Sequence, residues 1–383
     1  MIFFKSSPNI KFIYYRMLRF YLLVIPTIIF YSLSFSQANI DSVKTYNQNL
    51  FLKLQILIEL NGSFKEAVFL SEEAFENRLF SFDNYLDAIK TYAKLSVKKG
   101  QTINLKSYRS SDSTNYIKNT AIFKTITRPV IFQNDSVIFQ SIPFKYNFSD
   151  PQGDKDFTNT FVTKLLVTHE GNCRSLVYLY KILADEVGAK CWLSLAPNHI
   201  YIRNYSKQIG WYNTELTSGS FPTDAWIAAS GYVNTDAIRS GLYMDTLSNR
   251  QAIGLCILDL LHGYIRQTNN YTDGFVLKGC DLVLKYHPVN PMALLLKAEA
   301  LKRLYAEQKQ NNDAMADNTF FQMQDTYTTL IKLGYREMPK KAYQQWLANL
   351  AKEKEKFQNQ DLPKISTLPK TDTISTTKPL KAF

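Results

Sequence analysis

Residues 171–188 read GNCRSLVYLYKILADEVG, and this stretch decides the fold around it. Its apolar residues recur at helical spacing, and Gly188 supplies the stop that commonly ends a helix. Cys173 therefore lies in the first turn, where unpaired backbone N–H groups and the positive end of the helix dipole favour a thiolate. Because an unassisted thiol is only slightly ionised at neutral pH, a nucleophilic Cys173 also needs a base nearby.

Two predicted strands follow this helix and supply a candidate base. Residues 189–195 form the first strand, and residues 199–203 form the second after a turn at Ala-Pro-Asn. The second strand alternates, which places His199 and Arg203 on the same face. His199 is therefore the candidate general base for Cys173.

A third predicted strand supplies a candidate acid. Residues 211–215 read WYNTE, and alternation places three side chains on one face, those of Trp211, Asn213 and Glu215. We take the register in which Arg203 pairs with Trp211. In that register His199 lies directly opposite Glu215, at ~4.5–5.5 Å between Cβ atoms. We expect the carboxylate to accept the Nδ1 proton and to leave Nε2 facing the thiol.

These residues resemble the transglutaminase-like (papain-like cysteine) superfamily. In that family a Cys at a helix start is followed by a His on a strand, and then by an acid four residues after a Trp and two before a Thr. Cys173, His199 and Glu215 match those positions. The resemblance covers residues 145–230 and implies an α+β fold, in which a Cys-bearing helix packs on an antiparallel sheet. It also implies thiol-dependent acyl transfer, and we expect no cofactor.

The chain departs from the family pattern at two positions, and its oxyanion donors are open. Glu215 replaces the commoner Asp, and Arg174 stands where many members carry an aromatic residue. The Cys173 N–H is one candidate oxyanion donor, and a side chain near Tyr146 or Asn147 is a second. Further oxyanion or supporting candidates are Asn172, Asn213 and Trp211.

The sequence leaves several chemical alternatives open. Hydrolysis of peptide or isopeptide amides and transfer of the acyl group to an amine use the same residues. A cysteine on an amphipathic helix is more often a small buried hydrophobe. The alternative to an enzyme is thus an inactive envelope scaffold that binds proteins. A metal site at His169 and Cys173 is disfavoured because Gly171-Asn172 interrupts any helix that they would share.

The four cysteines restrict disulfide formation and zinc binding. No CxxC pair occurs, which argues against a zinc ribbon or finger. Cys256 and Cys280 lie on adjacent predicted helices, where they either form a disulfide or stay reduced.

Residues 1–36 are predicted to be a signal peptide. A basic start precedes an apolar run at 20–33, and Ser34–Ala38 is small and polar. The apolar run is shorter than the ~20 residues of a spanning helix, so we expect cleavage near Ser36 and export to the periplasm or medium. The formal charge is +12, and without the four basic residues of this segment it is +8. Lysines alternate with acids elsewhere, which predicts a solvated surface and no nucleic-acid partner.

The remaining chain divides into four predicted regions: N-terminal helices (37–105), the transglutaminase-like domain (106–245), tetratricopeptide-like (TPR-like) helices (246–350) and a disordered tail (351–383). Within the second region, residues 107–150 carry short runs such as Ala121–Phe123 and predict irregular strands and loops. The TPR-like region holds a single helical hairpin. One hairpin cannot bury its own apolar face, so we expect it to pack on the neighbouring domain. The expected partners are a peptide or protein substrate and a protein bound by the C-terminal helices, and no membrane-spanning segment is expected after cleavage.

Overall fold

The computed structural model describes residues 40–75, 81–134, 137–352, 359, 362 and 373–375. The predicted signal peptide therefore lies outside the described residues. Across these ranges, no helix combines the length and the apolar character needed to cross a membrane.

The N-terminal region folds into helices, as its spacing predicts. A helix over residues 40–60 ends where Asn61 adopts a positive φ of 54°. Ser63 then caps α2 (Phe64–Glu73) by accepting the Glu66 N–H at 3.2 Å. The next helix of this region is α3 (Phe82–Gln101).

The expectation of irregular strands over residues 107–150 is wrong for its first half. Helix α4 (Ser113–Thr127) contains the apolar run Ala121–Phe123. Buried residues occur on several sides of this helix, so no single apolar stripe marks it in the sequence. The second half does hold strands: β1 (Ile131–Asn134) and β2 (Val137–Gln140) form an antiparallel pair, and β8 (Thr373–Ser375) adds to β1 in parallel.

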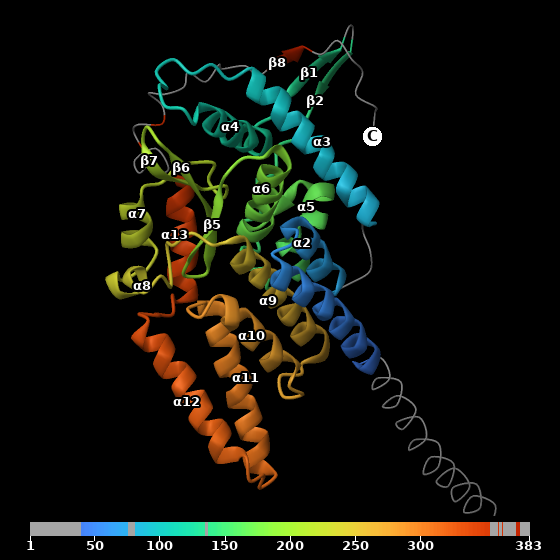
Figure 1. Cartoon of the computed structure of the whole chain (residues 1–383), viewed down its shortest axis with the longest axis vertical. Coiled ribbons are helices and arrows are strands. Elements are labelled where there is room, and N and C mark those ends of the chain that lie inside the picture. Colours follow the sequence, from blue (N-terminus) through green and yellow to red (C-terminus); the bar gives the residue numbers. More distant parts are fainter. Residues whose placement is uncertain are drawn as a thin grey trace, which may run out of the picture.

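A small antiparallel sheet and one helix form the centre of the molecule. The sheet has the order β5–β6–β7, with bounds Trp192–Ala196, His199–Ser206 and Gly210–Thr214. Helix α6 (Cys173–Val187) packs on it and ends at Gly188, whose φ is 65° (Figure 1). The mixture of helices with this sheet makes the fold α+β.

The predicted register between β6 and β7 is wrong by two residues. Arg203 pairs with Asn213, and Trp211 pairs with Tyr205. The cause is an unequal extension of the two strands: β6 ends three residues later than predicted, whereas β7 begins only one residue earlier. The loop at residues 207–209 is therefore centred on residue 208 instead of residue 207. A shift of two residues leaves every side chain on its predicted face.

Short elements connect α4 to α6. A parallel pair joins β3 (Lys145–Tyr146) to β4 (Glu170–Gly171), and between them lie η1 (Phe157–Thr160) and α5 (Val162–Thr168). The Glu72 carboxylate of α2 accepts the N–H groups of the first two residues of α5, at 2.6 and 2.9 Å. The N-terminal helices therefore hold the segment that leads into Cys173.

Within the described part of the chain, the sheet is followed by the helices α7 (Asp224–Ser230), α8 (Thr235–Arg239), α9 (Asn249–Thr268), α10 (Phe275–Tyr286), α11 (Pro291–Gln310), α12 (Ala316–Lys332) and α13 (Lys340–Lys352). The predicted helical hairpin consists of α10 and α11, which residues 287–290 separate. Figure 1 shows α12 and α11 extending away from the sheet, whereas α13 returns alongside it. One apolar cluster runs through the N-terminal helices, the sheet and the C-terminal helices.

Most of the predicted tail, 351–383, lies outside the described residues. Among those described, the Asn359 N–H donates to the Phe221 carbonyl at 2.8 Å, and Leu362 is buried beside Tyr116 and Tyr212.

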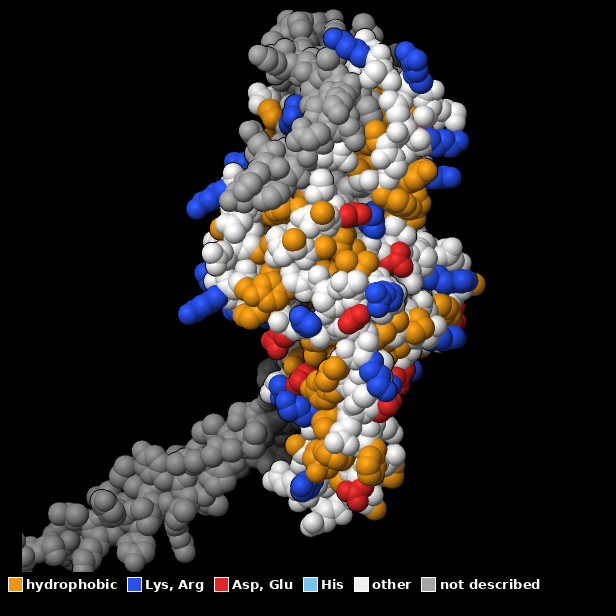
Figure 2. Space-filling model, turned by 90° about the vertical axis from the view of Figure 1, so that its left-hand side faces the viewer, with side chains coloured by type: hydrophobic (Ala, Val, Ile, Leu, Met, Phe, Trp, Pro, Cys, Tyr) orange, Lys and Arg blue, Asp and Glu red, His pale blue; other side chains and the backbone are white. Residues whose placement is uncertain are grey.

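On the face in Figure 2, Lys and Arg side chains are scattered. That distribution matches the expected solvated surface.

Candidate active site

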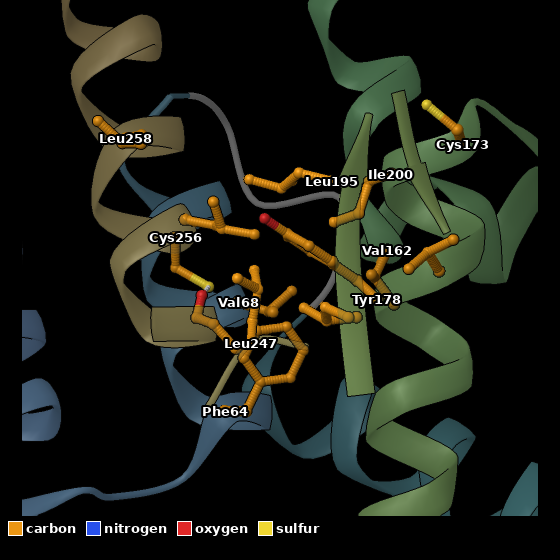
Figure 3. Close-up of a cluster of buried hydrophobic side chains, with 14 of the residues drawn as sticks. Phe64, Val68, Val162, Cys173, Tyr178, Leu195, Ile200, Leu247, Cys256 and Leu258 are labelled. Carbon is orange, nitrogen blue, oxygen red and sulfur yellow. Dashed lines mark hydrogen bonds between the residues drawn. The ribbon is translucent and has the colours of Figure 1, made fainter. Parts of the chain in front are cut away.

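Cys173 is the first residue of α6, and the two residues before it explain its position. The Asn172 side chain caps the helix by accepting the N–H groups of Arg174 (2.9 Å) and Ser175 (3.4 Å). Gly171 is needed because a Cβ there would lie 2.2 Å from Ser175 Oγ. Figure 3 shows Cys173 at the start of the helix that continues into the buried cluster. Asn172 therefore acts as a helix cap, which leaves its side-chain oxygen occupied.

His199 and Glu215 form a buried pair. His199 begins β6, and its Nε2 lies 2.7 Å from Glu215 Oε2. The other carboxylate oxygen accepts the Thr217 N–H at 2.8 Å. The exposed fractions are 6% for His199 and 2% for Glu215, so water does not screen the pair.

The prediction that Glu215 contacts Nδ1 is wrong, because Nε2 makes that contact. Nδ1 is buried and has no hydrogen-bond partner of standard geometry within the described part of the chain. The Cys173 thiol nevertheless lies within interaction range of the ring. The acid therefore binds the ring at Nε2, and the thiol lies close enough to the same ring for their charges to interact.

The register explains why the acid at position 215 is Glu, whose side chain is longer than that of Asp. Continuing the observed pairing beyond β7 places Glu215 opposite Tyr201, so His199 is its diagonal neighbour. Diagonal neighbours lie ~7–8 Å apart, further than directly opposed residues. The additional methylene of Glu, compared with Asp, lets the carboxylate span this distance.

The charges of the three groups support one another. Burial opposes ionisation of the Cys173 thiol, but the attraction of the nearby His199 charge outweighs burial and lowers the pKa of Cys173. Burial likewise opposes protonation of His199, but Glu215 and Cys173 together raise the pKa of His199 to about 10. The helix N-terminus acts in the same direction on the thiol. Both shifts favour a thiolate–imidazolium pair over a neutral thiol and imidazole.

Helix α13 covers this cluster, and the sequence analysis missed its role. Trp346 packs against the His199 ring with centroids 4.7 Å apart and stacks on Trp226 of α7. Its indole N–H donates to Ser230 Oγ at 3.0 Å. The buried residues of α13 recur at helical spacing: Tyr343, Trp346, Leu347 and Leu350. That stripe was visible in the sequence, although its docking site was not.

Tyr146, rather than Asn147, faces the cluster. Tyr146 is buried, and its own burial and the charge of Cys173 both raise its pKa. Its hydroxyl donates weakly to the Pro151 carbonyl at 3.4 Å. The Asn147 side chain instead accepts the N–H groups of Ser149 and Asp150, which closes a loop. Tyr146 is the better-placed candidate for the second oxyanion donor.

Trp211 and Asn213 do not reach the site, contrary to the prediction. Trp211 is 45% exposed and packs against Trp192 and Tyr205. The amide nitrogen of Asn213 donates to the Pro222 carbonyl and to Asp224 Oδ1. They lie on the predicted face, but the two-residue register shift moves both further from His199.

His169, Cys256 and Cys280 are not part of the cluster of Cys173, His199 and Glu215. His169 stacks on Phe144 and shares a hydrogen bond with the Tyr92 hydroxyl at 2.8 Å. No group of three or more metal-ligating side chains occurs within the described ranges. Cys256 and Cys280 are both buried free thiols, so of the two alternatives the structure has the reduced one.

A cavity of about 280 Å³ opens beside the cluster. Both Cys173 and His199 line it, together with residues of α9, of α11 and of the segment between α12 and α13. Arg174 also lines it and forms an ion pair with Asp259 of α9. Tyr178 of α6 reaches towards the same helix (Figure 3), where its hydroxyl donates to Asp259 at 3.0 Å. The C-terminal helices therefore form one wall of the cavity.

The comparisons with known proteins returned no match. No family model, curated protein or solved structure matches the chain. The resemblance to transglutaminase-like proteins rests on the residues around Cys173, His199 and Glu215.

Proposed function

We propose that the chain is a thiol-dependent acyl-transfer enzyme of the transglutaminase-like type, which hydrolyses peptide or isopeptide amides. The observation that carries this proposal is the buried contact of 2.7 Å between His199 Nε2 and Glu215 Oε2, with Cys173 beside the same ring. A thiol, an imidazole and a carboxylate arranged in this order can serve as the nucleophile, its base and the group that orients the base. We also propose that α6 and the β5–β7 sheet form a transglutaminase- or papain-type core.

In the first half-reaction, the Cys173 thiolate attacks the carbonyl carbon of an amide and forms a C–S bond. The carbonyl electron pair moves to oxygen, where the Cys173 N–H and the Tyr146 hydroxyl are the candidate donors. As the pair returns, the C–N bond breaks and the His199 imidazolium gives its proton to the departing amine. The product is a thioester on Cys173 and a free amine.

In the second half-reaction, neutral His199 accepts a proton from water, which attacks the thioester carbon. The C–S bond breaks, the carboxylic acid is released, and the thiolate–imidazolium pair is restored. An amine in place of water would give a new amide. Glu215 stabilises the imidazolium and fixes the ring throughout.

The first test is the pH dependence of thiol alkylation by iodoacetamide in the mature protein, read site by site with mass spectrometry. We expect Cys173 to react rapidly well below pH 8, because His199 lowers its pKa. His199→Ala should shift that profile to the range of an ordinary thiol, and Cys173→Ser should remove the reactive site. An amide library then identifies substrates. Ordinary thiol behaviour of Cys173, unchanged by His199→Ala, would overturn the proposal.

The alternative is a binding platform without turnover, and the burial of Cys173 favours it. Its exposed fraction is 7%, and α13 packs over the neighbouring histidine. A platform predicts that peptides bind in the cavity with equal affinity in wild type and Cys173→Ser, and that no thioester forms. Detection of a covalent acyl adduct on Cys173 by mass spectrometry would exclude it.

We further propose export, with a signal peptide cleaved near Ser36. N-terminal sequencing of the protein recovered from the periplasm or medium tests this directly. A start close to residue 37 is expected, and retention of Met1 or Met17 would contradict cleavage.

A further inference from the structure

The cavity beside Cys173 and His199 has a one-sided set of charges. Three arginines line it: Arg174, Arg266 and Arg336. No Asp or Glu belongs to its lining as far as the chain is described. Apolar side chains form much of the remaining wall: Leu195, Met292, Leu295 and Met338.

Two of these arginines have no carboxylate partner. Arg174 is paired with Asp259. Arg266 lies over the Phe157 ring, 4.7 Å from its centroid, and Arg336 is exposed in the segment between α12 and α13. Neither forms an ion pair with a carboxylate of the described residues. Both guanidinium groups are therefore available to a ligand.

The surroundings of His262 show that the positive charge extends into the cavity. His262 lies on α9 and lines the same space. Burial and the charges of Arg174 and Arg266 lower the pKa of His262 to about 4. The His262 ring is neutral at pH 7, so Arg266 and Arg336 are the unpaired charges of the cavity lining.

We infer that the cavity binds a free carboxylate of the substrate, close to the amide that Cys173 attacks, and that Arg266 and Arg336 determine this specificity. The inference rests on the proposed function. A guanidinium group offers paired N–H donors that match a carboxylate, and these bonds are stronger than neutral ones. The apolar wall suits the aliphatic part of an acidic residue. The substrate class is an acidic peptide, whose carboxylate belongs to an Asp or Glu side chain or to a chain terminus.

The test compares alkylation of Cys173 by anionic iodoacetate and by neutral iodoacetamide, in the full chain at pH 7. The readout is the ratio of the two second-order rate constants, at low ionic strength and in 0.5 M salt. We expect the double variant Arg266→Gln with Arg336→Gln to lower the ratio about tenfold at low salt, and less at high salt because ions screen the charges. His199 is unchanged in both proteins and cancels from the comparison.

A matched control removes one positive charge elsewhere. Arg239 is exposed at the end of α8 and does not line the cavity, so Arg239→Gln should leave the ratio unchanged. Rapid reaction with iodoacetamide but an unchanged ratio in the double variant would overturn the inference and leave the proposed function intact. Failure of Cys173 to react with either reagent would overturn both.

Peptide substrates then distinguish the two sources of the carboxylate. One pair of peptides differs by Glu against Gln beside the cleaved amide, and a second pair has a free or an amidated C-terminus. We expect kcat/KM to fall about tenfold or more on neutralising one of the two carboxylates, and the double variant to abolish that difference. Equal kcat/KM within both pairs would contradict the inference.

Discussion

Cys173 and Cys256 are both buried helix cysteines, yet their surroundings are opposite. Cys256 lies in the middle of α9, where its thiol contacts the Ala252 carbonyl of its own helix. Burial, with the nearby Glu72 carboxylate, raises the pKa of Cys256 far above its usual range. Cys173 lies at the first position of α6, and there His199 outweighs burial and lowers the pKa.

The comparison indicates that burial alone raises the pKa of a thiol, whereas a buried thiol beside a protonatable partner has its pKa lowered. Removing water penalises an isolated thiolate, but it also strengthens the attraction between a thiolate and an imidazolium. The position within the helix adds to this difference, because the free N–H groups occur only at the start. Reactivity should therefore differ sharply between two cysteines of similar exposure.

The largest effect is expected for Cys173→Ser. Amide hydrolysis should fall by more than about 10⁴-fold, because a hydroxyl is a far weaker nucleophile at the same position. Steady-state kinetics on a substrate from the library measures this. Residual activity near that of the wild type would place the chemistry at another residue.

His199→Ala is expected to lower hydrolysis by about 10³-fold, since it removes the general acid and base. In the wild type, activity should rise with pH through the lowered pKa of Cys173. It should fall again through the His199 pKa of about 10, where the imidazolium that protonates the amine is lost. A pH–rate profile measures both limbs. A profile without the upper limb would contradict the acid role of His199.

Glu215→Gln should lower hydrolysis by about 10²- to 10³-fold, because it removes the negative charge that stabilises the imidazolium. The upper limb of the pH profile should move below 10, since Glu215 raises the His199 pKa. Glu215→Asp keeps the charge but is one methylene short of the diagonal to His199. If the Asp variant matched the wild type, the argument from the register would be wrong.

Trp346→Ala should destabilise the fold by about 3–5 kcal/mol, the usual cost of removing a buried aromatic side chain. It should also admit water to the His199–Glu215 pair, with a loss of activity of about tenfold. Urea unfolding and kinetics measure the two effects. Trp346→Phe retains the ring stacking and should recover most of both.

The smallest effect is expected for Cys256→Ala. Alkylation of Cys173 and amide hydrolysis should be unchanged, and the stability should fall by about 1 kcal/mol. Thermal unfolding measures the change in stability, and site-resolved mass spectrometry measures the alkylation of Cys173. Rapid alkylation of Cys256 in the native wild type would remove the contrast between the two thiols.

Local features of the site were predictable from the sequence, and long-range features were not. Helical spacing and Gly188 locate α6, and strict alternation locates the strand that begins at His199. The register depends on the length of the loop at 207–209, which propensity does not determine. Helix α4 was missed because burial on several sides removes its amphipathic pattern.

The covering helix was missed for a different reason. The apolar stripe of α13 is evident in its sequence, but nothing local states that Trp346 packs on His199 rather than on the neighbouring α12. The positions of Arg266 and Arg336 beside Cys173 likewise depend on how distant helices pack. Sequence patterns identify such elements without giving their partners.

The position of Trp346 in the chain has a consequence for the order in which the candidate site is completed. A ribosome releases Cys173 and His199 long before α13, so in a growing chain the ring lacks its aromatic cover. Without that cover water reaches the imidazole, and its attraction for the thiolate weakens. The buried surroundings of His199 are therefore complete only after α13 has been synthesised and Trp346 has packed on the ring.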